Sequence, residues 1–520
     1  MEKSFLTVNI PADGLFLAIL NHANGDFSKE NCEKIICEYI GQFLAAEPDM
    51  IFLNVCYRRS LTPSKIFDSY LYNIETDEDG YAIKEQGESI KEYSPVTKNV
   101  SKYFMSFIVC ARELLKNDID IYKFAINRIK QTKCRVFLSV RMNDAHYIGD
   151  PAINSSFALK NGGEHTIHRD GAHLDYSQKA VQNYYYSYIQ ELLQNYQVDG
   201  IELDWLRYPT VLPPQKCFDY HILNDYMKKI RRLINVYDDH AALAVRMLPT
   251  EEKNLEHGFD VCGWIADGNV DILTIENFYI PTNFELPIAQ WRSSIEKRNT
   301  KNNPYCLLCG ADWGVSCVPH YYIAMTPALV RGFTDTCLTG GADGVYLFNF
   351  FEENDDSSFE FVSGQKTTGH LENCFLERIK AANESECLPR RYVHIGSSDD
   401  RYPISLSSKN SYTFVKTINS PYKTVKCVVG CDKDVSLTVY ANDRFVGVFK
   451  KQPVCFGFEH ISEEDISKEH RFIYAVSQAA PFVGYVCLPD DIAEKRELKI
   501  TIENTLCNEV KLLWLELVCE

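Results

Sequence analysis

Two acidic residues stand two positions apart in the string VDGIELDWLRYP, at Val198–Pro209. If GIELD is a β-strand, its side chains alternate between two faces, so Glu202 and Asp204 share one face and the aliphatic residues share the other. Two carboxylates on the inner face of a buried strand are difficult to explain by packing, because an unpaired buried charge is costly. We interpret both as candidates for acid–base or nucleophilic catalysis. The alternative is a structural network of ion pairs with Arg141 or Arg246.

Further polar side chains follow other apolar runs. The run VDILTIE ends at Glu276, which alternation places on the inner face. We expect Asp204 and Glu276 to form a catalytic pair, with Glu202 and Asp312 in reserve, and the alternative for Glu276 is an ion pair with Arg246. Seven residues at or after strand ends are candidates for binding a ligand: Arg141, Asn143, Arg207, Arg246, Asp312, Trp313 and Asn349.

These residues need elements that bring them together. Eight apolar runs are the strand candidates: Leu15–Leu20, Met50–Cys56, Arg135–Met142, Gly200–Asp204, Ala241–Met247, Val270–Glu276, Tyr305–Gly310 and Gly344–Asn349. Helical stretches between them are Ser28–Ala46, Asp118–Thr132, Ser177–Tyr196, Phe218–Asn235, Leu286–Arg298 and Thr326–Thr339. Strands that alternate with helices predict parallel units, and eight of them close into a (β/α)8 TIM barrel. The strand ends then meet at one solvent-accessible mouth.

Two connections in this region are unusually long. One runs from Arg58 to about Asp118, and the other covers Tyr147–Tyr176. A loop as long as the first in a compact domain is usually functional or a lid. The first run, Leu15–Leu20, is expected to offer Asn21 and His22 at its end.

The pattern changes from about Ser397. Strand-like runs then follow one another with turns between them, and AND in VYANDRFVGVF is a hairpin signal. This predicts an all-β sandwich, jelly-roll-like, after the barrel. We place the barrel at 1–390 and the sandwich at 391–520. We expect the sandwich to brace the barrel rather than to bind sugar, because Trp514 alternates with aliphatic residues as a core residue does.

Composition excludes several classes of function. The 520-residue chain has a net charge of -17, which would repel nucleic acid and anionic membrane surfaces. No run approaches the roughly 20 apolar residues of a membrane helix, and the N-terminal sequence does not match the pattern of a signal peptide.

The 19 cysteines are scattered through apolar runs, which indicates free thiols in a reducing compartment. We therefore expect a cytoplasmic protein without disulfides. Cys306 and Cys309 form a CxxC that we interpret as core thiols on opposite faces of a strand.

Other chemistries have weaker signals. The string HTIHRDGAHLD holds His165, His168, Asp170, His173 and Asp175, which could bind a metal ion but match no zinc spacing. The sequence has no GxSxG, GxGxxG or GxxxxGK[ST] motif. The hypotheses of a serine hydrolase and of a nucleotide-binding protein therefore have little support. We expect neither a metal nor another cofactor.

The segment Leu174–Pro209 resembles the middle of the glycoside hydrolase-like family 10 barrels, with their pattern Y-x-V-D-G-I-x-x-D-Y-x-R-Y-P. The matching residues are Tyr196, Val198, Asp199, Gly200, Ile201, Asp204, Arg207, Tyr208 and Pro209, and Trp205 stands where the family has Tyr. The resemblance implies a TIM-barrel protein that acts on carbohydrate, without assigning the reaction.

The same string is also similar to the D-G-x-D-x-D-x-E strand of chitinase-type family 18 barrels. Asp199, Gly200 and Asp204 fit this pattern, with Glu202 where Asp is usual. Leu206 stands at the position of the final acid, so the substrate-assisted mechanism would lack its proton donor. We therefore reject chitinase activity.

The leading hypothesis is a cytoplasmic glycoside hydrolase with a carboxylate pair, an oligosaccharide or glycoside substrate and no cofactor. Arginines at the mouth would keep carboxylates ionised or bind substrate. The alternatives are a non-catalytic carbohydrate-binding barrel and a metal-assisted hydrolase that uses the His165–Asp175 cluster.

Overall fold

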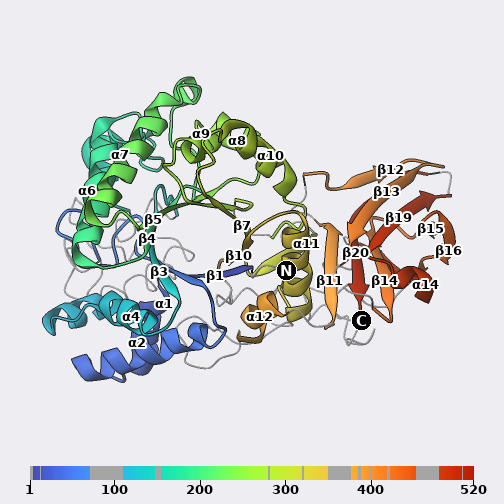
Figure 1. The fold of residues 1–520 in the computed structure, drawn as a ribbon, viewed down its shortest axis with the longest axis horizontal. Helices are drawn as coiled ribbons and strands as arrows, with labels where there is room; N and C mark the ends of the chain where they lie inside the picture. Colours follow the sequence, from blue (N-terminus) through green and yellow to red (C-terminus); the bar gives the residue numbers. More distant parts are fainter. Residues whose placement is uncertain are drawn as a thin grey trace.

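The computed structural model shows a barrel joined to a β-sandwich (Figure 1). It describes residues 4–11, 13–70, 109–146, 154–278, 282–318, 321–349, 376–384, 388–396, 400–418, 422–451, 480–505 and 508–520. Most of the first long connection, and the start of the second, lie outside these residues. So do the strand-like run at 471–476 and the possible helix at 461–469.

The barrel is a closed ring of eight parallel strands in the order β1-β10-β7-β6-β5-β4-β3-β2. The strands are β1 (Phe5–Ile10), β2 (Met50–Asn54), β3 (Arg135–Arg141), β4 (Gly200–Asp204), β5 (Ala242–Met247), β6 (Ile272–Ile275), β7 (Cys306–Ala311) and β10 (Gly344–Leu347). The predicted TIM barrel is therefore confirmed, and seven of its strands fall on the predicted runs.

The prediction for the first strand is wrong. Leu15–Leu20 lies within helix α1 (Gly14–His22), and the barrel begins earlier, at β1. Leu and Ala favour helices, whereas the β1 sequence FLTVNI is rich in β-branched residues, which favour strands. Asn21 and His22 therefore end a helix and do not lie at the end of a barrel strand.

Helices surround the barrel (Figure 1). Six of them match the predicted stretches: α2 (Lys29–Leu44), α4 (Ile121–Lys130), α6 (Lys179–Asn195), α7 (His221–Tyr237), α10 (Ile288–Arg298) and α11 (Pro327–Thr339). Shorter helices that were not predicted lie in the described part of the barrel as well, among them α5 (Ser156–Gly163), α8 (Glu251–Glu256), α9 (Val261–Ala266) and α12 (Leu376–Lys380). No helix in the described part of the chain is long and apolar enough to cross a membrane.

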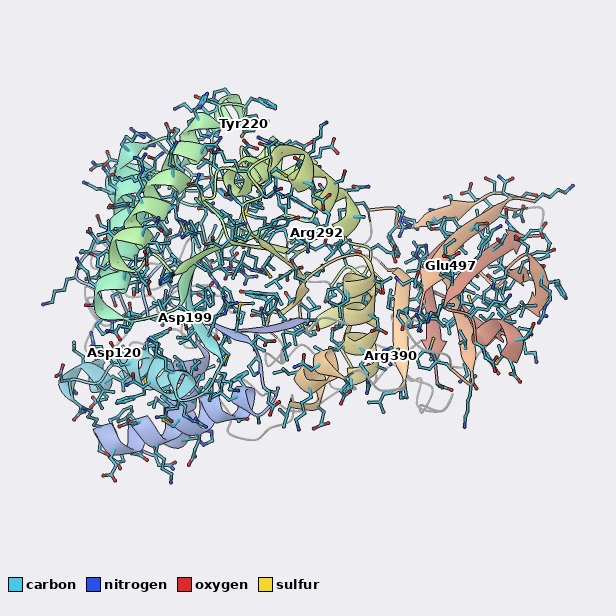
Figure 2. All side chains as sticks on the ribbon, viewed as in Figure 1. Asp120, Asp199, Tyr220, Arg292, Arg390 and Glu497 are labelled. Atoms are coloured by element: carbon cyan, nitrogen blue, oxygen red, sulfur yellow. The ribbon has the colours of Figure 1, made fainter. Side chains whose placement is uncertain are left out.

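Four alternate strands of the barrel have the same kind of hydrogen bond at their amino ends. Each is preceded by an aspartate whose carboxylate accepts the backbone N–H of a residue in a neighbouring strand. The bonds are Asp49 to Leu6 (3.0 Å), Asp199 to Val136 (2.7 Å), Asp271 to Leu243 (2.7 Å) and Asp343 to Leu307 (2.7 Å). Asp199, labelled in Figure 2, is thus a structural residue at the end of the barrel opposite the strand ends that carry the candidates.

The inner face of the barrel is aromatic at its centre. The rings of Phe52 and Phe137 stack with centroids 4.4 Å apart, and Tyr346 packs edge-on against Phe52 at 5.3 Å. Cys306 packs with this inner cluster, whereas Cys309 belongs to the core between strands and helices. The two cysteines therefore face opposite sides of β7, as predicted.

The second unit consists of antiparallel sheets, and the predicted sandwich is confirmed. One sheet holds β11 (Arg390–Ile395), β12 (Ile404–Leu406), β14 (Val425–Cys431), β17 (Lys450–Lys451), β18 (Phe482–Cys487) and β20 (Val510–Cys519). The other holds β13 (Ser411–Thr417), β15 (Leu437–Ala441), β16 (Arg444–Val448) and β19 (Glu497–Asn504). The predicted hairpin joins β15 to β16 through Asn442 and Asp443, whose φ angles of 49° and 65° suit a two-residue turn.

The sandwich contacts the barrel through β11 and helix α11. A Cβ at Gly332 of α11 would overlap the backbone of Arg391, so only glycine allows this close approach. The Tyr392 hydroxyl donates to Asp335 of α11 at 2.8 Å. Trp514 of β20 is buried and belongs to the same apolar cluster as the barrel core. These contacts are those of a module that packs tightly against the barrel.

Candidate active site

The candidate site is built around one arginine at the carboxyl ends of three neighbouring strands. Arg246 of β5 donates through Nη1 to Asp204 Oδ2 at 3.0 Å and through Nε to Glu276 Oε2 at 2.8 Å. All three side chains are buried. The register pairs Asp204 directly with Arg246, so both project inward from β4 and β5. The alternation predicted from sequence therefore places Asp204 and Glu276 on a shared guanidinium, and the ion pair considered as the alternative is present as well.

Glu276 needs space that its neighbour supplies. On the adjacent strand β7, a Cβ at Gly310 would overlap the Glu276 carboxylate. Glycine thus lets the carboxylate lie flat against the inner face of the barrel. Burial raises the pKa of Glu276, and the positive charge of Arg246 opposes that rise only in part.

Asp204 is more enclosed than predicted. Its Oδ1 accepts a hydrogen bond from the backbone N–H of Leu206 at 3.1 Å, and its Oδ2 is occupied by Arg246. The Asp204 side chain is buried, with 0% exposure, and Glu276 is 2% exposed, so the solvent-accessible position expected for both carboxylates is wrong. The turn that follows β4 folds back over its end and brings the Leu206 amide to the carboxylate.

Glu202 lies one layer deeper and contacts the far side of the barrel. Its Oε1 accepts from Ser139 Oγ at 2.6 Å and from the Tyr346 hydroxyl at 2.9 Å. The Tyr346 oxygen in turn accepts from Asn9 Nδ2 at 2.8 Å. Glu202 Oε2 is buried and has no hydrogen-bond partner among the described residues. Burial, followed by the negative charge of Asp204, raises the pKa of Glu202 to about 8.

Sequence reasoning missed Tyr346 and Asn9 as partners of Glu202. The signal for Tyr346 was present, because alternation in GVYLF separates it from Val345 and Leu347. Its contact with Glu202 joins residues 144 positions apart and depends on closure of the barrel.

Asp312 follows β7 and lies in the same acidic group. Its Oδ1 accepts the backbone N–H of Trp313 at 2.8 Å, and both side chains are buried. Burial and the negative charge of Glu276 raise the pKa of Asp312 to about 7.

Asn349, two residues beyond β10, is also buried, with a left-handed φ of 54°. Its Oδ1 has no hydrogen-bond partner within the described part of the chain.

Arg141 pairs with Asp144 and not with the two carboxylates of β4 that the structural alternative considered. Its Nη1 donates to Asp144 Oδ2 at 2.9 Å, and its guanidinium carbon lies 4.6 Å from the Tyr57 ring centroid. Asp144 Oδ1 also accepts the backbone N–H of His146 at 3.0 Å and contacts its ring Nδ1 at 2.6 Å. Although burial opposes it, the charges of His146, Arg141 and Arg207 hold the pKa of Asp144 well below its usual range.

Arg207 is the third arginine of the group. The Phe348 ring lies beside it, with its centroid 5.2 Å from the guanidinium carbon of Arg207 and 3.7 Å from that of Arg246. Arg207 is 9% exposed, and its Nε is buried without a hydrogen-bond partner among the residues that the structure describes. In the described ranges, no carboxylate lies within ion-pair distance of Arg207.

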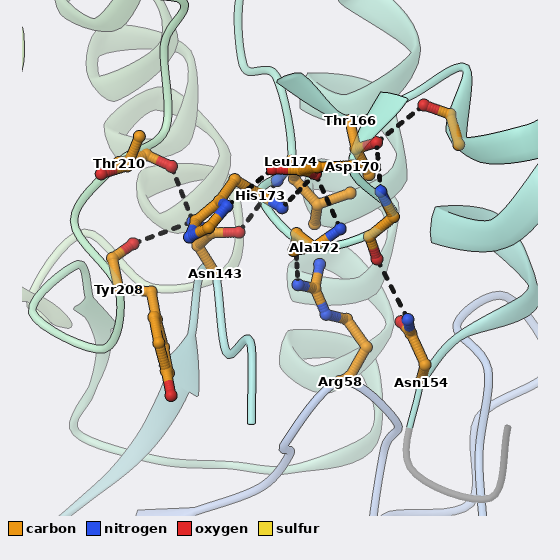
Figure 3. Close-up of polar contacts among 12 residues, drawn as sticks. Arg58, Asn143, Asn154, Thr166, Asp170, Ala172, His173, Leu174, Tyr208 and Thr210 are labelled. Atoms are coloured by element: carbon orange, nitrogen blue, oxygen red, sulfur yellow. Dashed lines mark hydrogen bonds and ion pairs between the residues drawn. The ribbon is translucent and has the colours of Figure 1, made fainter. Parts of the chain in front are cut away.

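Asn143 holds loops together beside the site (Figure 3). Its Nδ2 donates to the backbone oxygens of Tyr208 at 2.8 Å and Thr210 at 2.9 Å, and its Oδ1 accepts the N–H of Leu174 at 3.0 Å. Its side chain therefore connects three chain segments through backbone atoms. Binding of substrate by Asn143 stays a prediction.

Aromatic rings gather around Tyr208, which has a left-handed φ of 60°. The ring of His146 meets it edge-on at 5.0 Å and that of Phe278 at 5.5 Å. Phe278 is 37% exposed and Tyr208 is half-buried. These rings give the loops after β3, β4 and β6 an apolar surface next to the polar group.

The histidine-rich segment does not gather its side chains around one point. The His165 ring stacks on Phe157 at 4.0 Å, whereas His173 Nδ1 contacts Asp170 Oδ2 at 2.8 Å. Asp175 accepts from the Ser177 backbone and hydroxyl. Across the described residues, no group of three or more His, Cys, Asp or Glu side chains could hold a metal ion. The geometry therefore gives the metal-assisted alternative no support.

Comparison with known proteins leaves the family open. No protein-family model matches the chain, and no curated protein matches it. Membership of glycoside hydrolase-like family 10 therefore stays a prediction.

Solved structures match the chain only at low TM-scores and low sequence identity. One is an α-L-fucosidase GH29 from Bacteroides thetaiotaomicron, with a TM-score of 0.37, 9% identity, and coverage of 96% of this chain and 92% of that one. Another is the PgaB glycoside hydrolase domain from Bordetella bronchiseptica, with a TM-score of 0.36, 10% identity, and coverage of 67% and 94%. A third is a cycloisomaltooligosaccharide glucanotransferase from Paenibacillus sp., with a TM-score of 0.29 and 8% identity. The match covers 98% of this chain and 57% of the length of that protein. TM-scores this low carry no argument about the fold or the reaction.

Proposed function

We propose that the protein is a glycoside hydrolase whose catalytic carboxyl groups are Asp204 and Glu276. The observation that carries the proposal is the pair of carboxylates held by Arg246 at the carboxyl ends of neighbouring strands in a closed parallel barrel. This end of a (β/α)8 barrel is where catalytic groups are placed, and glycoside hydrolysis needs two carboxyl groups beside the scissile bond.

The two carboxyl groups have different surroundings, which suits different roles. Asp204 accepts two hydrogen bonds and is the candidate nucleophile or base. Glu276 is bonded on one oxygen, and burial raises its pKa, so it is the better candidate for the proton donor. Arg246 fixes the orientation of both. Asp312, with a pKa near 7, is the reserve acid on the next strand.

The surroundings suit a sugar. Hydroxyl groups need partners that donate and accept hydrogen bonds, and Arg207, Asp312 and Asn349 supply both kinds. Sugar rings also present apolar faces, for which Tyr208 and Phe278 offer aromatic surface beside the polar groups. We propose a carbohydrate substrate and no cofactor, because two carboxyl groups are sufficient for the reaction.

A panel of nitrophenyl glycosides tests the proposal. Native protein should release nitrophenol from at least one glycoside of the panel. The double variant Asp204→Asn/Glu276→Gln, purified in parallel, should release none, which excludes a contaminating glycosidase. Equal release by both preparations, or none by either, would contradict the proposal.

The complete burial of Asp204 favours a second candidate, a carbohydrate-binding barrel without catalysis. In that case sugars bind at the site, the native protein turns over no glycoside, and the Asp204–Arg246–Glu276 group only stabilises the barrel. Calorimetric titration with oligosaccharides, run beside the panel, separates binding from turnover.

A further inference from the structure

We infer that the sugar bound at this site carries an anionic group, a carboxylate, sulfate or phosphate, and that Arg207 binds it. The inference rests on the proposed function, because it assumes that the carbohydrate site lies at the Asp204–Glu276 end of the barrel. It adds a substrate class to that site.

The three arginines of the site differ in how their charge is balanced. Arg141 has Asp144 at 2.9 Å, and Arg246 has Asp204 at 3.0 Å and a second carboxylate at 2.8 Å. Arg207 alone has no carboxylate within ion-pair distance among the described residues, although it is nine-tenths buried. A buried guanidinium without a partner is costly, because removal from water is not repaid by hydrogen bonds. An anion from the substrate would supply the missing partner.

Arg207 is also placed where a substrate group would meet it. It follows Asp204 by three residues in the sequence. Its positive charge opposes the rise that burial causes in the pKa values of Glu276 and Asp312, so Arg207 lies within electrostatic reach of both. Its planar group is held beside the Phe348 ring at 5.2 Å. An oriented guanidinium loses little freedom on binding and matches two oxygens of an anion at once.

The alternative occupant is a neutral sugar whose hydroxyls accept from Arg207. A hydroxyl would satisfy a donor but would bring no negative charge into direct contact with the Arg207 guanidinium. An anionic group satisfies both, and charge-assisted hydrogen bonds are roughly twice as strong as neutral ones. Asn349 Oδ1, a buried acceptor without a partner in the described chain, can serve a hydroxyl of the same sugar.

Binding of simple sugars to the full chain tests the inference without any need for turnover. We would measure the apparent Kd of glucuronate, galacturonate, glucose 6-sulfate, glucose 6-phosphate and glucose by ligand-detected NMR at one ionic strength. At least one anionic sugar should bind about tenfold or more tightly than glucose. Which one does so distinguishes a carboxylate from a sulfate or a phosphate.

Two variants and a control locate the effect. Arg207→Gln should remove the preference for the anionic sugar, and Arg207→Lys should retain only part of it, because a lysine cannot bind two oxygens in one plane. Arg292→Gln is the control, since Arg292 pairs with Asp343 at the opposite end of the barrel and should leave the preference intact.

Equal binding of glucose and every anionic sugar, or a preference that survives Arg207→Gln, would overturn the inference. Failure of the proposed function looks different. If no glycoside is hydrolysed while anionic sugars bind through Arg207, hydrolysis fails and the inference stands. If neutral glycosides are hydrolysed and anionic sugars gain nothing, the function stands and the inference fails.

Discussion

Replacement of Glu202 by Gln should change how the stability of the barrel depends on pH. Glu202 is fully buried and its pKa is raised to about 8 from an ordinary value of 4.5. Between these two values the folded chain keeps a proton on Glu202 that the unfolded chain has released. Stability contributed by this group is therefore present below pH 4.5 and is lost as the pH rises toward 8.

The size of the effect follows from the same pKa values. One proton taken up on folding makes the free energy of unfolding fall by about 1.4 kcal/mol for each pH unit. Between pH 5 and pH 7.5, the native protein should lose about 3 kcal/mol relative to Glu202→Gln. Other groups that titrate are common to both proteins and largely cancel in the difference. The amide oxygen that the substitution introduces can still accept from Ser139 and Tyr346, so the contacts across the barrel are retained.

Urea unfolding at several pH values measures this difference. Tryptophan fluorescence is a suitable probe, because four of the five tryptophans belong to the barrel. The control is Glu497→Gln, an exposed position at the start of β19, which should leave the pH dependence unchanged. Parallel pH profiles for the native protein and Glu202→Gln would refute a protonated Glu202 at neutral pH.

Three further results are expected. Gly310→Ala should lower the free energy of unfolding by about 1–3 kcal/mol in urea melts, because the new methyl group would overlap the Glu276 carboxylate, and native stability would contradict that packing. Lys416→Met should lower the free energy of unfolding by about 2 kcal/mol at pH 7 but very little near pH 2. Lys416 Nζ donates to Glu285 Oε1 at 2.9 Å. Although burial raises the pKa of Glu285, Lys416 and His394 lower it to about 2. Stability from that carboxylate is present above pH 4.5 and lost as the pH falls, so an equal loss at both pH values would be inconsistent with it. Thiol titration of unfolded protein should recover nearly all 19 cysteines, and many oxidised cysteines in fresh protein would overturn the predicted reducing compartment.

The barrel could be predicted because seven of its strands are short aliphatic runs separated by amphipathic helices. The first strand could not, since LFLAIL is more apolar than FLTVNI and periodicity cannot assign so short a run. The aspartates before alternate strands were also missed. Asp199 was read as part of a family motif, whereas its carboxylate accepts the Val136 amide.

The sequence predicted the strand face on which each side chain of the site lies, but not the contacts that each makes. Alternation placed Glu202 and Asp204 inside the barrel and Glu276 beside Arg246. It could not show that Asp204 is fully enclosed, because that depends on the turn that brings the Leu206 amide back to the strand end. Contacts across the barrel likewise depend on its closure, which no local pattern contains.

Catalysis by the Asp204–Glu276 pair is tested most directly by kcat/KM for the best glycoside of the panel. The proposal predicts that Asp204→Asn and Glu276→Gln each lose on the order of 10²-fold or more, the scale of acid–base catalysis. Asp343→Asn, at the opposite end of the barrel, should keep the native rate in its folded fraction. If Glu276→Gln unfolds more easily but its folded fraction keeps the native rate, Glu276 is a structural partner of Arg246, and the proposed pair is wrong.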